Sequence, residues 1–85
     1  METRVAVISL IVTDSKVIET LNGILHTYSE FIIGRMGLPY RAKNVNIICI
    51  AVDAPQNIIS AMSGKLGVLS GVNVKTAYSN VISSD

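Results

Sequence analysis

Residues 58–76 read IISAMSGKLGVLSGVNVKT, and within this stretch the apolar spacing changes from that of a helix to that of a strand. The helical part carries an apolar stripe made of Ile58, Ile59, Met62, Leu66 and Leu69. The strand part alternates apolar and polar side chains from Val72 to Thr76. Between them, Gly64, Gly67 and Gly71 should permit close backbone approach and a left-handed end to the helix. The stretch therefore predicts a helix that ends at Leu66 or Gly67, followed by an edge strand.

Two other segments are apolar on both alternating faces, as central strands of a sheet are. They are Thr3–Val12 and Val45–Val52. A further strand is predicted at Phe31–Met36, ended by Gly37-Leu38-Pro39 because proline cannot donate to a sheet ladder. A loop should follow over Tyr40–Lys43.

A first helix is predicted from about Ser15 to Ser29, with the side-chain oxygens of Thr13-Asp14-Ser15 as its cap. Its apolar stripe consists of Val17, Ile18, Leu21, Ile24, Leu25 and Tyr28. Asp53 and Gln56 have the spacing of a capping box, which predicts the start of the second helix. The tail Asn80–Asp85 should be frayed.

The resulting order is β-α-β-β-α-β, which predicts an α+β, ferredoxin-like fold in one domain spanning residues 1–85. The sheet should be four-stranded and antiparallel, with both helices on one face and the first and third strands in the centre. The other face would then expose the second apolar side of those strands. Since monomers seldom tolerate so large an apolar patch, we expect a homodimer or homotetramer, assembled through this face or an edge strand.

Composition excludes several classes of function. The 85 residues are 49% hydrophobic and 15% charged, and seven basic against six acidic residues give a net charge of +1 without a basic run. No direct nucleic-acid or membrane binding is therefore expected. The longest apolar stretch, Val5–Val12, is too short to span a bilayer, and no signal-peptide cleavage site accompanies it. The single cysteine, Cys49, favours a reducing compartment, so the expected location is the cytoplasm.

No catalytic group can be recognised. The acidic residues are spaced as caps and solvated positions, and no nucleophile has a base nearby, so we do not expect an enzyme or a cofactor. His26 is expected near or beyond the edge of the helix stripe, and Cys49 is expected to be a small core residue. A zinc or nickel ion needs three or four ligands, so these two residues form no metal site within one chain and would need a second subunit to complete one.

The segment Gly64-Lys65-Leu66-Gly67 matches two motifs incompletely. It lacks the upstream glycine and the Ser or Thr of a phosphate-binding P-loop. It matches the GXXG of KH modules, which bind nucleic-acid backbones, but that loop joins two helices and this one leads into a strand. The structural interpretation, a close approach of helix to sheet and a helix stop, is favoured, and Lys65 is left as a candidate for a ligand or interface role.

Three segments together resemble one known family. They are Arg35–Arg41 (RMGLPYR), the strand Val45–Asp53, and Ser63–Gly67 (SGKLG) with its continuation Gly71–Thr76 (GVNVKT). On these motifs the chain resembles the iron-only hydrogenase system regulators from Arg4 to Tyr78. Either glycine-containing motif alone is weakly specific, but the joint occurrence of the two motifs at this separation is fairly specific.

The resemblance implies an ACT-like domain, related in fold to the effector domain of nickel-responsive repressors and to amino-acid-binding ACT domains. It also implies a cytoplasmic regulatory role connected with the assembly of [FeFe] hydrogenase. The nickel ligand set of those repressors is absent, since only His26 and Cys49 are present, so nickel sensing is not implied. Two functions follow as alternatives: a regulatory domain whose oligomer senses a small molecule, and a structural subunit that binds another protein and no ligand.

The resemblance also suggests where an effector would bind. ACT-like domains hold effectors at subunit interfaces near the first strand-helix turn, where backbone amides favour an anion. In this chain that turn is Thr13-Asp14-Ser15, although Asp14 would repel a carboxylate. The cations best placed to receive an anionic effector or a protein partner are Arg35, Arg41 and Lys65.

Overall fold

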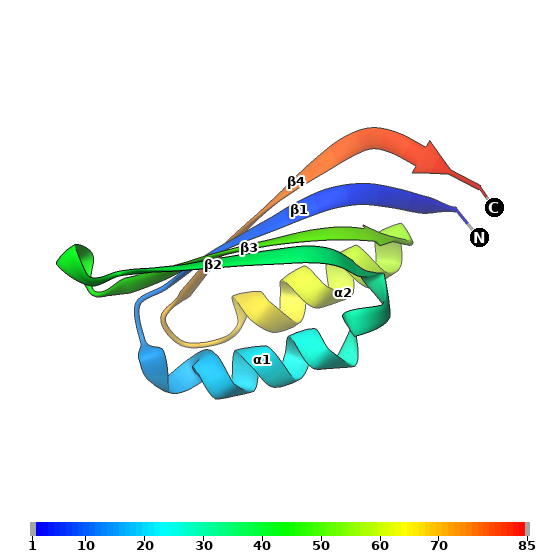
Figure 1. Cartoon of the computed structure of the whole chain (residues 1–85). Helices are drawn as coiled ribbons and strands as arrows, with labels where there is room; N and C mark the ends of the chain where they lie inside the picture. Colours follow the sequence, from blue (N-terminus) through cyan, green and yellow to red (C-terminus); the bar gives the residue numbers. More distant parts are fainter. Residues whose placement is uncertain (1, 85) are drawn as a thin grey trace.

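The computed structural model describes residues 2–84 of the chain (Figure 1). Each half of the chain contributes a strand, a helix and a second strand. In chain order the strands and α-helices are β1 (Thr3–Val12), α1 (Ile18–Thr27), β2 (Ile32–Tyr40), β3 (Val45–Ala54), α2 (Gln56–Gly67) and β4 (Val72–Ser83). Three short 3₁₀ turns join them, and these are η1 (Ser15–Val17), η2 (Ser29–Phe31) and η3 (Arg41–Lys43).

The four strands form one antiparallel sheet in the order β2-β3-β1-β4. The strands predicted to be central, β1 and β3, do lie in the centre, and both helices lie against one face of the sheet (Figure 1). The predicted α+β, ferredoxin-like architecture is therefore confirmed.

The core lies between this face and the helices, because every second residue of β1 and β3 meets the apolar stripes of α1 and α2. Its fully buried side chains include Ile8, Leu10 and Ile50 from the sheet and Leu21, Ile59, Met62 and Leu66 from the helices. The predicted stripes are confirmed, since their remaining members are buried or pack against this cluster.

The predicted end of β2 before Pro39 is wrong. The strand continues to Tyr40, and Pro39 pairs with Asn46 of β3. β2 is an edge strand, and a backbone N–H on its outer side would donate only to solvent. Proline, which has no N–H, can therefore occupy such a position without loss of a hydrogen bond in the sheet. The loop predicted over residues 40–43 consequently begins one residue later and consists of η3 and its C-cap Asn44, which has the left-handed conformation (φ 54°).

Both predicted helix starts need correction. The first helical segment begins at Ser15 as a 3₁₀ turn and becomes α-helical only at Ile18, and it ends at Thr27. The predicted Asp53 capping box is absent, because β3 runs on to Ala54 and Asp53 pairs with Val5 inside the ladder. Pro55 occupies the N-cap position, and it has no side-chain cap.

The three glycines of the opening stretch have different roles. A side chain at Gly64 or Gly67 would meet no atom within 4 Å, so the expected close approach of helix to sheet does not occur there. Gly71 has a left-handed conformation (φ +73°), and a Cβ atom added to it would lie 2.7 Å from the Cβ of Asp14. The close approach and the positive φ therefore both belong to Gly71, at the start of β4.

The GXXG segment is also not a loop. Residues 64–67 form the last part of α2, so the arrangement of a KH nucleic-acid clamp is not present.

The tail predicted to be frayed is ordered as far as Ser83, in β4, and only Asp85 lies outside the described residues. The extra residues of this strand are absorbed in a bulge opposite Val5, where the Ser79 hydroxyl donates to the Val5 carbonyl. Neither helix of the described chain is long and apolar enough to cross a membrane.

Candidate functional site

Three loops of the chain meet at one end of the sheet. The register pairs Val12 of β1 with Val72 on one side and with Asn46 on the other, and Asn46 pairs with Pro39. These residues form one row across the sheet. The turn after β1, the loop before β4 and the tip of the β2–β3 hairpin therefore project from the same end, which Figure 1 shows. We call this end of the molecule the loop end.

The predicted effector turn, Thr13-Asp14-Ser15, is at the loop end and is already hydrogen-bonded within the chain. The backbone N–H of Thr13 donates to the Gly71 carbonyl at 2.8 Å, and its hydroxyl donates to the same oxygen at 3.1 Å. The Asp14 carboxylate accepts from the backbone N–H of Lys16 at 3.0 Å, as the predicted cap required. Ser15 is exposed.

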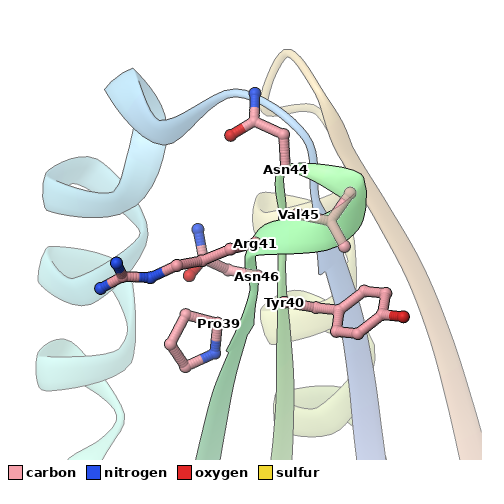
Figure 2. Close-up of a pocket in the computed structure, with 6 residues that line it drawn as sticks. All are labelled: Pro39, Tyr40, Arg41, Asn44, Val45 and Asn46. Atoms are coloured by element: carbon pink, nitrogen blue, oxygen red, sulfur yellow. The ribbon is translucent and has the colours of Figure 1, made fainter.

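Arg41 lies at the hairpin tip of the same end. It lines a notch of about 90 Å³ together with Pro39, Tyr40, Asn44, Val45 and Asn46. Figure 2 shows Arg41, Pro39 and Asn46 on the side of the hairpin that faces the helices, whereas Tyr40 points to the other side. The notch thus joins a guanidinium group and an amide side chain, which are two donors suited to an anionic group.

Arg35 is positioned elsewhere. It pairs with Ile50, so its side chain lies on the helix side of the sheet, and its Nη2 donates to Oδ1 of Asn22 in α1 at 2.6 Å. The guanidinium therefore connects the edge strand β2 to α1.

Lys65 is also separate from the turn. Its ammonium lies 5.1 Å from the centroid of the Tyr28 ring, which is a cation–π distance. Tyr28 caps the C-terminus of α1, whereas Thr13-Asp14-Ser15 lies at the N-terminus of the same helical segment. The structure thus brings the turn and Arg41 to the loop end, and it directs Arg35 and Lys65 toward contacts with α1.

The face of the sheet opposite the helices is here called the open face, and no other element of residues 2–84 covers it (Figure 1). The register assigns to it Val5, Val7, Ser9 and Ile11 of β1, Gly34, Met36, Leu38 and Tyr40 of β2, Val45, Ile47, Cys49, Ala51 and Asp53 of β3, and Asn73, Lys75 and Ala77 of β4.

Cys49 is on this face and not in the core, so its predicted placement is wrong. It is partly exposed in a shallow hollow of about 340 Å³ that is also lined by Val7, Gly34, Arg35, Met36 and Ala51. Both faces of β3 are apolar, and for that reason the sequence pattern did not distinguish the residue facing the helices from the one facing away.

His26 is exposed on α1, in agreement with its predicted place outside the stripe. Within residues 2–84, no group of three or more His, Cys, Asp or Glu side chains lies close enough to hold a metal ion.

Two contacts of the predicted site residues could not be found by sequence reasoning. Asn22, the partner of Arg35, is an exposed polar residue on α1 without a distinguishing pattern. Gly71, which binds Thr13, was recognised as a special glycine, but its distance of 58 positions in the chain from Thr13 concealed the contact.

The comparisons with known proteins agree with this architecture. Residues 4–76 match the family described as "TM1266-like: Iron-only hydrogenase system regulator, putative". A solved structure, that of the uncharacterized protein TM1266 from Thermotoga maritima, is 38% identical and superposes with a TM-score of 0.85, covering 89% of this chain and 96% of that one. No curated protein matches the chain. Because the family match spans most of the chain, and the TM1266 structure is 38% identical over 89% of it, the chain belongs to this TM1266-like family.

Proposed function

We propose that this chain is a non-catalytic regulatory domain of an iron-only hydrogenase system that binds a small anionic effector and acts as a homo-oligomer in the cytoplasm. Membership of the TM1266-like family supports the regulatory part. The observation that carries the effector part is that Arg41 lines a notch of the β2–β3 hairpin at the same end of the sheet as the turn predicted to bind the effector.

The size of the notch limits the group it can hold. About 90 Å³ suits one carboxylate or phosphate group and not a whole metabolite. The anionic head would accept hydrogen bonds from Arg41 and Asn46, and the rest of the effector would extend over the loops. Ser15 is exposed nearby on the same end and supplies a further hydroxyl, whereas Asp14 disfavours a second negative group.

Arg35 and Lys65 have a smaller part in this proposal than the sequence suggested. Their charged groups already contact Asn22 and Tyr28, and an effector would have to displace them. We therefore assign the anion to Arg41, and Thr13, Asp14 and Ser15 lie at the same end of the sheet.

A thermal-shift screen against amino acids, nucleotides and anionic cofactors tests this function, because a ligand that binds only the folded state raises the melting temperature. We expect at least one anionic compound to stabilise the chain, and we expect Arg41→Ala to abolish that shift. Lys43→Ala is the matched control, since it removes one positive charge from the same η3 turn without touching the notch. A shift that survives Arg41→Ala would refute the site.

The second candidate function is a structural subunit that binds a separate protein and no ligand. The observation that favours it is the exposed apolar open face, which suits a protein partner better than a small polar molecule. If no compound raises the melting temperature while the chain co-purifies with another protein from its native cell, this alternative replaces the effector proposal.

A further inference from the structure

We infer that the open face is the surface through which two copies of this chain associate, face to face, and that neither edge strand serves this purpose. The inference rests on the homo-oligomer of the proposed function and not on its effector.

The open face is an apolar surface that the fold leaves uncovered. Its exposed large side chains are Val7 (39%), Ile11 (45%), Met36 (57%), Leu38 (53%) and Tyr40 (47%). Between them lie the partly buried Val5, Val45, Ile47, Cys49 and Ala51, so the apolar surface is continuous across β2, β3 and β1. A contiguous patch of this kind indicates an interaction surface.

The area of the face is enough for a small dimer. Four strands about 4.8 Å apart are about 19 Å wide, and the ten residues of β3 extend for about 33 Å. The flat product is about 600 Å² per copy, so two faces would remove about 1,200 Å² from solvent, which lies at the lower limit for a specific, stable interface. Protruding side chains add to this value.

The edge strands are poorly suited to pairing. β2 carries a bulge at Ile33 and has Pro39 in its ladder, and β4 carries a bulge between Tyr78 and Ile82. Bulges and proline in an edge strand prevent a second strand from continuing the sheet. The bulges and the proline therefore disfavour association through either edge strand, and the open face has no comparable feature.

The shape of the open face also favours a second sheet. Gly34, Ala51 and Cys49 are small and create the hollow of about 340 Å³, while Met36 and Leu38 protrude beside it. Facing sheets interlock by placing the protruding side chains of one into the hollows of the other. One copy of this face offers both shapes, as a self-complementary interface requires.

Charge argues for a copy of this chain over a charged partner. The face bears one cation, Lys75, at its β4 margin and one acid, Asp53, at the end of β3, so it has no field that would select an acidic or a basic protein. Lys75 lies at the margin of the face, so its long stem can pack against the edge of the interface while the ammonium reaches solvent.

The test combines molar mass with the reactivity of Cys49, the only cysteine of the chain. We expect light scattering to give about 18 kDa or an even multiple of 9.1 kDa, and Leu38→Lys to return it to 9.1 kDa. The matched control is Val68→Lys, at a side chain that is 84% exposed in the turn after α2, and it should keep the parent mass. Circular dichroism should show that both variants are folded.

The rate at which a thiol reagent modifies Cys49 identifies the surface. If the open face is covered, the rate should fall at least tenfold as the protein concentration rises and should stay high at all concentrations in Leu38→Lys. A mass of 9.1 kDa at every concentration would overturn the inference together with the oligomer of the proposed function. An oligomer in which Cys49 reacts at the Leu38→Lys rate would overturn the inference alone, because association would then use another surface.

Discussion

Thr13 and Gly71 are joined by two hydrogen bonds to one atom: the Gly71 carbonyl oxygen accepts from the backbone N–H of Thr13 and from its hydroxyl. This contact fixes the turn after β1 against the loop before β4, and it defines the shape of the loop end. Asp14 lies so close that only glycine fits at position 71.

The first prediction is that Gly71→Ala lowers the free energy of unfolding by about 1–3 kcal/mol. The substitution places a Cβ 2.7 Å from the Cβ of Asp14 and forces alanine into a positive φ. Urea denaturation measures the change. Gly64→Ala is the control, since it lies inside α2 with no atom within 4 Å of the new methyl, and it should stabilise the chain by about 0.5–1 kcal/mol. Equal effects of the two substitutions would contradict the distinction.

The second prediction concerns Arg35 and Asn22. Arg35→Ala should leave the fold intact, and a double-mutant cycle with Asn22→Ala should give a coupling energy of about 0.5 kcal/mol, because the bond between them is exposed to solvent. The same Arg35→Ala variant should bind an effector as the parent does. If instead it loses effector binding while Arg41→Ala retains it, the anion site belongs at Arg35.

The third prediction tests the core. Met62 is fully buried between α2 and the sheet, so Met62→Ala should cost about 2–5 kcal/mol of the free energy of unfolding. Val68→Ala, at the exposed turn after α2, should change it by less than about 0.5 kcal/mol. Both values come from chemical denaturation, and a small effect of Met62→Ala would mean that α2 does not pack as described.

The fourth prediction concerns the hydroxyl pair between α2 and β4. Ser63 Oγ and Thr76 Oγ1 share a partly buried hydrogen bond of 2.7 Å. Thr76→Val should lower the free energy of unfolding by about 0.5–1.5 kcal/mol, because Ser63 then loses its partner. Thr76→Ser retains the hydroxyl and should recover part of this loss. If Thr76→Val leaves the free energy of unfolding unchanged, the hydrogen bond does not contribute and the prediction is wrong.

The sequence predicted the architecture well, since alternation over β1 and β3 and the stripes of α1 and α2 are local properties of the chain. It failed where a residue acts according to its place in the sheet. Pro39 was expected to end β2, but an edge position tolerates it, and Asp53 was expected to cap α2, but it pairs with Val5 in the ladder. Neither outcome can be inferred from neighbouring residues alone.

The candidate site was predicted less completely than the fold. Thr13, Asp14, Ser15 and Arg41 do share one end, as the order of strands and helices requires. The partners of Arg35 and Lys65 depend on the distance between the helices and the sheet edge, which no sequence pattern encodes. Cys49 was assigned to the core because both faces of β3 are apolar, and only the register shows which of them meets the helices.

The most direct test of the central claim, that an anionic effector binds at the loop end, is an amide NMR titration of the isotope-labelled chain with the compound that gives the largest thermal shift. The account predicts that the resonances that move belong to Thr13–Ser15, Arg41–Asn46 and residues 68–71, and that these changes disappear in Arg41→Ala. Changes confined to the open face, around Cys49 and Ala51, or an unaltered titration of Arg41→Ala, would contradict it.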